Sequence, residues 1–144
     1  MNKKEKINVI FLDYDGVISI EKNGLEIEFE NPEAIWFISK LCLEKNFKIV
    51  VSSTWRNHPK YKEMLYDQGL DEDVEIIGCT ETGFVGREVE IKNYLSDHTN
   101  IDKFIIIDDA DFNSDLKDHL VQTTLSKGFN KQKYLEALEL IDKL

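Results

Sequence analysis

The sequence INVIFLDYDGV, residues 7–17, decides the fold of this 144-residue chain. Its first six residues form an apolar-rich run, which is typical of a strand buried on both faces of a parallel sheet. Asp13 and Asp15 follow this run, and Gly16 allows the backbone to turn sharply after them. The stretch therefore predicts a buried strand that brings two carboxylates to the edge of a sheet.

Apolar runs and helical repeats alternate along the rest of the chain. The further strands predicted by apolar runs are residues 47–51, 74–77, 104–107 and 120–123. The helices predicted by apolar residues at helical spacing are residues 32–45, 59–68, 87–97 and a last one after Gly128. This alternation predicts an α/β fold with a doubly wound, mainly parallel, Rossmann-like sheet of about five strands and helices on both faces.

The segment 16–30 departs from this alternation. Asn23-Gly24 is a typical turn dipeptide, and residues 25–29 alternate apolar and polar side chains. We therefore expect a small flap hairpin in this segment. Because no repeat, low-complexity stretch or linker divides the chain, we expect residues 1–144 to form a single domain.

Composition limits the partners of the protein. Eighteen Lys and Arg residues against 28 Asp and Glu residues give a net charge of −10, which disfavours a general nucleic-acid-binding surface. An enzyme that takes one phosphate end into a local pocket remains compatible with this charge. No apolar run approaches the roughly 20 residues that span a bilayer, so we expect no membrane contact. Two cysteines, Cys42 and Cys79, are too few for a disulfide framework and favour reduced thiols in a cytoplasmic protein.

Two acidic pairs are expected at one edge of the sheet. In doubly wound sheets, ligands bind beyond the carboxyl ends of the strands, where Asp13 and Asp15 follow one strand and Asp108 and Asp109 follow another. Carboxylates this close repel one another and are costly to bury without a compensating cation. Either pair alone is also typical of solvated strand-end acids. Two pairs at neighbouring strand ends favour a Mg²⁺ site, because Mg²⁺ prefers oxygen ligands and a substrate phosphate.

Hydroxyl and cationic side chains supply candidate phosphate ligands. Ser52 and Ser53 follow residues 47–51, and a hydroxyl at a strand end can hold a phosphate oxygen. Arg87 opens a predicted helix and Lys92 lies deeper in it, and either cation would stabilise a bound phosphate. Viewed singly, these residues are equally typical of helix caps and solvated helix charges.

The order of these motifs resembles the haloacid dehalogenase (HAD) superfamily of phosphohydrolases. The first motif of that superfamily is a strand ending in Asp-x-Asp-Gly-(Val/Thr), which corresponds to residues 13–17. Its fourth motif is a strand ending in an acidic pair, which corresponds to Asp108-Asp109. The resemblance runs from about Ile7 to Asp109 and implies one HAD-like domain.

The second and third HAD motifs are less specific. The second is a strand ending in Ser or Thr, matched by Ser52 or by Ser53. The third is a Lys or Arg at a helix start, for which Arg87 is favoured and Lys92 is the alternative. Residues 52–56, together with the helix and strand that follow, are also similar to small capless HAD domains of RNA-repair-type proteins.

The resemblance implies a Mg²⁺-dependent phosphatase that hydrolyses phosphate monoesters. In that scheme Asp13 attacks phosphorus and forms an aspartyl-phosphate, while Asp15 protonates the leaving oxygen and later activates water. Ser52 and Arg87 would hold the phosphoryl oxygens. The implied metal ligands are Asp13, the backbone carbonyl of Asp15, Asp108 and Asp109.

The spacing of the motifs predicts an open site. Fewer than 40 residues separate Asp15 from Ser52, or Ser52 from Arg87, which leaves no room for a large cap domain. An open site suits a nucleotide, a nucleic-acid end or another large phosphorylated substrate. We expect Trp55 to stack a base and Arg56 to contact a second phosphate at the rim. The full set of expected substrate-binding residues is Gly16, Ser53, Trp55, Arg56 and Lys92.

Two alternatives to an enzyme share features of this sequence. A phosphate-accepting receiver domain also has a parallel sheet with acidic residues, but it carries the phosphorylated Asp after its third strand, an order this chain lacks. A catalytically silent HAD-like binding or interaction module is the other alternative. The intact pair of Asp13 and Asp15 favours the enzyme.

Overall fold

The computed structural model describes residues 5–21, 28–81 and 85–144. At residues 21, 28–30, 54 and 55 it describes the backbone only. Five parallel strands form one sheet in the order β5-β4-β1-β6-β7. These strands are β1 (Ile7–Leu12), β4 (Phe47–Val51), β5 (Ile76–Cys79), β6 (Ile101–Asp108) and β7 (Leu120–Gln122). The predicted doubly wound parallel α/β fold is confirmed.

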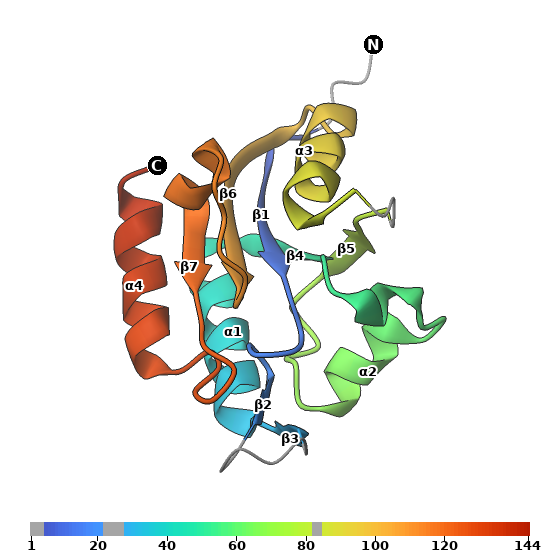
Figure 1. Ribbon diagram of the computed structural model, residues 1–144, viewed down its shortest axis with the longest axis vertical. Coiled ribbons are helices and arrows are strands. Elements are labelled where there is room, and N and C mark those ends of the chain that lie inside the picture. The colour runs from blue at the N-terminus through green and yellow to red at the C-terminus, as the bar shows by residue number, and fades with distance from the viewer. Residues whose placement is uncertain (1–4, 22–27, 82–84) are drawn as a thin grey trace.

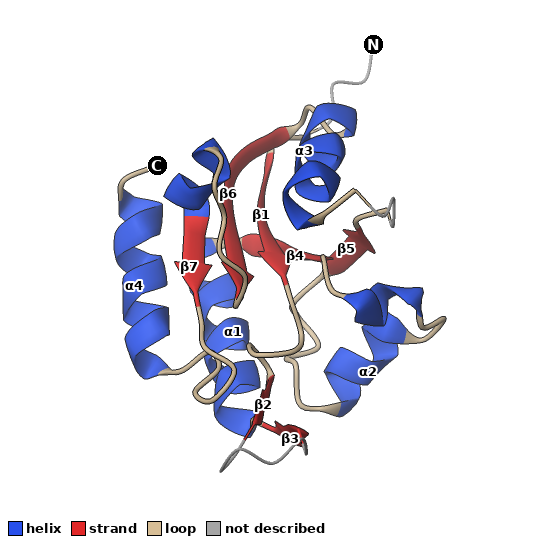
Figure 2. Cartoon of the chain, viewed as in Figure 1, coloured by secondary structure: helices blue, strands red, loops and turns tan. Residues whose placement is uncertain are grey.

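Helices cover both faces of the sheet (Figures 1 and 2). The helices are α1 (Pro32–Lys45), α2 (Tyr61–Asp67), α3 (Arg87–Asp97) and α4 (Lys131–Asp142), with two short 3₁₀ helices, η1 (Thr54–Asn57) and η2 (Asp115–His119). α1 and α4 lie on one face, and α3 and η2 lie on the other. Within the described segments there is no cap domain, and no helix is long and apolar enough to cross a membrane.

The position of β1 in the middle of the sheet explains why its sequence is almost wholly apolar. Ile10 and Leu12 point into the core beneath α1 and α4, whereas Val9 and Phe11 point into the core beneath α3 and η2. All four side chains are buried, since β1 pairs with β4 on one side and with β6 on the other. A strand buried on both faces keeps no polar alternation.

The path of the chain places a crevice beside β1. From β1 the chain runs outward to β4 and β5, and it then crosses to β6 and β7 on the other side. The strand order therefore reverses between β1 and β6, which is where doubly wound sheets bind ligands. The backbone N–H of Asp13 donates to the Ile107 carbonyl over 3.0 Å, so the two acidic strand ends lie side by side.

A two-stranded antiparallel hairpin lies in the segment predicted as a flap, at the carboxyl edge of the sheet (Figure 1). It consists of β2 (Ser19–Glu21) and β3 (Glu28–Glu30). The predicted turn at Asn23-Gly24 lies outside the described residues. Gly128, which precedes α4, packs closely against the chain just before the hairpin. Its φ is +61°, and a Cβ there would lie 2.6 Å from the Val17 carbonyl oxygen.

Three predicted boundaries were displaced by tertiary contacts. The strand expected at residues 74–77 lies at Ile76–Cys79, because buried Val74 offers its carbonyl to the Tyr66 hydroxyl instead of to the sheet. The strand expected at residues 104–107 begins at Ile101, where it pairs with the start of β1. The helix expected at residues 59–68 is shorter, since α2 begins only at Tyr61.

Candidate active site

Three carboxylates meet at the crevice between β1 and β6. Each of Asp13, Asp108 and Asp109 offers an oxygen within 4.8 Å of the others. Asp13 is 4% exposed and Asp108 is fully buried. Backbone N–H groups hold both carboxylates in place: Tyr14 donates to Asp13 Oδ1 over 2.8 Å, and Ala110 donates to Asp108 Oδ1 over 2.9 Å. The structure therefore brings together three of the four residues expected at the metal.

Gly16 makes room for the third carboxylate. Its φ is +77°, a conformation that L side chains rarely adopt. A Cβ at this position would lie 2.5 Å from Asp109 Oδ2. The glycine of the first motif is thus required both for the turn and for the approach of Asp109.

The electrostatics of the cluster favour a bound cation. Burial, with further repulsion from Asp108, raises the pKa of Asp13 to about 8, although Arg87 opposes the change. Burial also raises the pKa of Asp109. Crowded carboxylates with raised pKa values need additional positive charge to ionise together. Three carboxylates are hard oxygen donors, so the donor set fits Mg²⁺.

Arg87 is the cation that the protein itself places beside the acidic cluster. It is the first residue of α3, and its guanidinium forms ion pairs with Asp108 and, over 3.4 Å, with Asp13. Lys92, the alternative cation, instead forms an ion pair with exposed Asp115 of η2 over 3.3 Å. Of the two cations considered, the structure brings only Arg87 to the carboxylates.

Two buried hydroxyls follow adjacent strands at the same edge. The Ser52 N–H donates to the Leu12 carbonyl, and the Thr80 N–H donates to the Val51 carbonyl. Both side chains are at most 1% exposed, and neither hydroxyl has a hydrogen-bond partner among the described residues. An unpaired buried hydroxyl is costly, and both hydroxyls keep an unused capacity to donate a hydrogen bond. Sequence analysis did not single out Thr80, because the strand before it was expected to end at residue 77, whereas β5 extends to Cys79.

Three other residues expected at the site are Asp15, Ser53 and Trp55. The Asp15 carboxylate accepts a hydrogen bond from Ser19 Oγ over 3.3 Å, outside the group of three carboxylates. Ser53 is buried beside Ser52. The side chain of Trp55 lies outside the described part of the structure.

Arg56 is not at the exposed rim where it was expected. Its side chain is only 5% exposed and forms an ion pair with Glu90 of α3 over 2.8 Å. Its other terminal nitrogen, Nη1, donates to the Ser52 carbonyl over 3.0 Å. The expected contact with a second phosphate is therefore not the arrangement found here, because the guanidinium is turned into the protein. Glu90 was not identified from the sequence.

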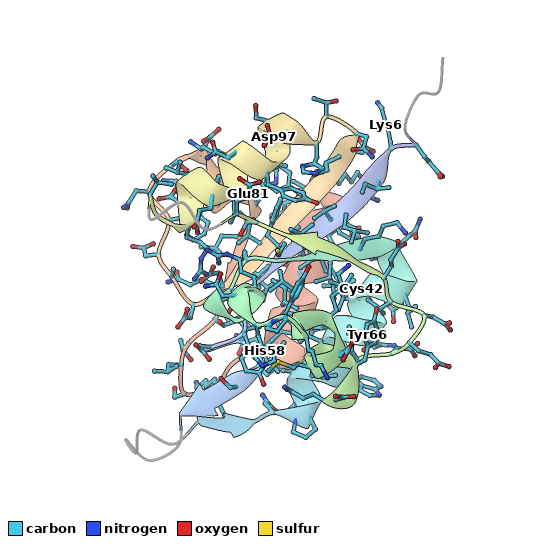
Figure 3. All side chains as sticks on the ribbon, turned by 90° about the vertical axis from the view of Figure 1, so that its right-hand side faces the viewer. Lys6, Cys42, His58, Tyr66, Glu81 and Asp97 are labelled. Carbon is cyan, nitrogen blue, oxygen red and sulfur yellow. The ribbon has the colours of Figure 1, made fainter. Side chains whose placement is uncertain are left out.

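The two cysteines are free, as expected. Cys42 lies on the α1 side of the molecule (Figure 3), where burial raises the pKa of its thiol to about 12. That thiol stays protonated at neutral pH. Cys79 is partly buried at the end of β5.

Comparison with known proteins agrees with this geometry. The family model for the HAD domain in Swiss Army Knife RNA repair proteins matches residues 9–134. The chain belongs to this family. The matched part of the HAD domain extends from β1 into α4 and includes the acidic cluster, Ser52 and Arg87. Membership supports a HAD-like hydrolase at the level of the superfamily. A search of the curated proteins found no match.

Two threonines offer a test of the unpaired hydroxyls. Thr123 is buried after β7, as Thr80 is after β5, but its hydroxyl donates to the Gly16 carbonyl over 2.6 Å. We expect Thr123→Val to lower the free energy of unfolding by about 1–3 kcal/mol, because a buried carbonyl loses its donor. Thr80→Val should leave the free energy of unfolding unchanged or raise it.

Urea unfolding of both variants in EDTA measures this difference. Equal destabilisation by the two substitutions would contradict the prediction, because it would mean that the Thr80 hydroxyl is already bonded in the unliganded protein.

Proposed function

We propose that this HAD domain is a Mg²⁺-dependent phosphatase that hydrolyses phosphate monoesters through an aspartyl-phosphate on Asp13. The observation that carries the proposal is the convergence of Asp13, Asp108 and Asp109 within 4.8 Å at the switch point of the sheet. Arg87 contacts two of these carboxylates, which supports the same assignment.

Each side chain has a role that its position supports. Asp13 ends the innermost strand, and the Tyr14 N–H on Oδ1 orients its carboxylate for attack on phosphorus. Asp15 lies two residues further on, where it would protonate the leaving oxygen and then take a proton from the attacking water. The unpaired Ser52 hydroxyl and the Arg87 guanidinium would bind the phosphoryl oxygens.

The metal would be held by the acidic cluster. Its ligands would be Asp13, Asp108, Asp109 and the backbone carbonyl of Asp15. When bound, Mg²⁺ would reduce the repulsion between the carboxylates and an anionic phosphate. Even with Arg87 nearby, the pKa of Asp13 is about 8. The side chains of the protein therefore do not fully offset the repulsion between these carboxylates.

The substrate class follows from the open edge of the sheet. Within the described residues the hairpin of β2 and β3 and helix α2 lie beside the site but no cap domain covers it, so a large phosphorylated molecule would have access. The family is named for RNA repair proteins, which favours a phosphorylated nucleic-acid end or a nucleotide. A net charge of −10 disfavours contacts along an extended nucleic acid, and so the terminal phosphate would be the main recognised group.

Asp13→Asn tests the proposed nucleophile. We expect the variant to fold, because the change removes a carboxylate from a crowded cluster, and to lose phosphate release by more than roughly a thousandfold. Phosphate release would be measured with Mg²⁺ on an aryl phosphate, nucleoside monophosphates, and RNA and DNA oligonucleotides with 3′- or 5′-phosphates.

Asp111→Asn is the matched control, since Asp111 is an exposed carboxylate two residues after Asp109. It should retain wild-type activity. Equal activity of Asp13→Asn and the wild type would disprove the assignment of the nucleophile. A wild type that binds Mg²⁺ but is silent on every substrate would favour the catalytically silent binding module.

The pH dependence of stability tests the metal site. A folded-state pKa of about 8 for Asp13, against 3.8 for an ordinary Asp, means that the folded protein binds this proton more tightly than the unfolded chain. The resulting stabilisation is present below about pH 4 and is lost as the pH rises towards 8. Mg²⁺ competes with this proton, so the rise in Tm on adding Mg²⁺ should be larger at pH 8 than at pH 6.

Thermal unfolding with Mg²⁺ or EDTA at pH 6, 7 and 8 measures the effect. Asp109→Asn should abolish most of the Mg²⁺-induced rise while keeping the protein folded. A rise that is the same at all three pH values would contradict the proposed competition.

A further inference from the structure

A buried ion pair joins the strand end that carries Ser52 to the helix that carries Arg87. Arg56 lies in η1, four residues after Ser52, and Glu90 lies in the first turn of α3. The two side chains are 5% and 7% exposed, and Arg56 Nη2 contacts Glu90 Oε2 over 2.8 Å. Arg56 Nη1 donates at the same time to the Ser52 carbonyl over 3.0 Å. One guanidinium thus links two segments that are far apart in the sequence.

Stability alone does not account for this pair. Taking both charges out of water costs free energy that their attraction only partly returns, and apolar residues of similar volume often serve stability as well or better. A fixed pair of opposite charges instead specifies one relative position of the two segments that carry it. Arg is suited to this task because its planar fork donates to two acceptors in a set geometry, which Lys does not do.

Glu90 lies on the side of α3 that faces the sheet. The buried residues of α3 are Glu90 and Ile91. Ile91 packs into the core beneath the helix, and such an apolar contact has no directional preference. The Glu90 contact with Arg56 is directional and fixes the first turn of α3 relative to the end of β4. Arg87 lies in this same turn, three residues before Glu90. The N-cap residue of α3 is Gly86, which has no side chain to cap the helix.

We propose that the Arg56–Glu90 ion pair is a positioning device, which sets the distance between the Ser52 hydroxyl and the Arg87 guanidinium. These two groups would bind oxygens of one phosphoryl group, so the pair controls the phosphate side of the site without touching substrate. This inference rests on the proposed phosphatase function. It replaces the expectation that Arg56 itself contacts a second phosphate.

Four variants separate positioning from stability. Glu90→Gln keeps the shape and removes the charge, and Arg56→Lys keeps the charge and removes the fork. The double variant Arg56→Met/Glu90→Leu replaces the pair by apolar residues. Asp97→Asn is the control, because it removes an exposed negative charge from the same helix.

The readouts are Tm, kcat and KM for an aryl phosphate with Mg²⁺, the dissociation constant of inorganic phosphate, and the Mg²⁺-induced rise in Tm. We expect Glu90→Gln and Arg56→Lys to lower kcat/KM by roughly ten- to a hundredfold, with weaker binding of inorganic phosphate. The Mg²⁺-induced rise in Tm should persist, since the three metal-cluster carboxylates are unchanged. Asp97→Asn should match the wild type in every readout.

The apolar double variant decides between the two roles. Positioning predicts that it recovers Tm but not kcat/KM or phosphate affinity. Recovery of all three would show that the pair only stabilises the fold and would overturn the inference. Wild-type kcat/KM in a folded Glu90→Gln would overturn it as well.

Hydrogen exchange separates this inference from the proposed function. A wild type that releases no phosphate would disprove the function, and with it the catalytic purpose of the pair. The tether itself predicts faster amide exchange in η1 and the first turn of α3 in Glu90→Gln than in Asp97→Asn. Equal exchange in these two variants would disprove the tether whether or not the wild type is active.

Discussion

Asp13 carries a carboxylate at the end of the innermost strand, where burial and the neighbouring Asp108 raise its pKa to about 8. Much of the surrounding structure compensates for this charge. Arg87 brings a cation to it and the Tyr14 N–H binds one of its oxygens, whereas Gly16, which has no Cβ, lets Asp109 approach as a further negative charge. The acidic cluster is therefore maintained by the fold at a cost in stability, as is common at functional sites.

The first turn of helix α3 contacts several of the segments around the acidic cluster. Arg87 reaches the carboxylates, and Glu90 reaches Arg56 beside Ser52. In the same turn, Glu88 accepts hydrogen bonds from the backbone N–H and the hydroxyl of Ser114, at 2.9 and 2.5 Å. Ser114 begins η2 on the loop that follows Asp108 and Asp109. A single helical turn thus contacts three of the strand-end segments that line the crevice, and its position affects all of them together.

From the sequence, the acidic convergence could be predicted and Arg87 could be favoured over Lys92, but the burial of Arg56 could not be predicted. Parallel strands end at one edge, so two apolar runs that end in acids predict that Asp13 and Asp108 meet. The choice between Arg87 and Lys92 depends on which side of α3 faces the sheet, and Glu90 and Ile91 show that side only in the structure. The Arg56–Glu90 pair spans 34 positions and carries no periodic signal. An Arg after a strand end is normally expected at the surface, which is why its burial was missed.

The overall charge and the local charge of this HAD domain act at different distances. A net charge of −10 repels a phosphorylated substrate, but salt screens this repulsion beyond about 10 Å at 0.1 M ionic strength. In the proposed phosphatase, attraction would come from groups at the crevice: Arg87, the N–H groups at the start of α3, and any cation bound by the acidic cluster. These groups act on a phosphate only after it has entered the crevice. A terminal phosphate can enter an open edge more readily than an internal phosphate flanked by the rest of a chain, so this charge distribution favours chain ends and phosphomonoesters over continuous nucleic acid.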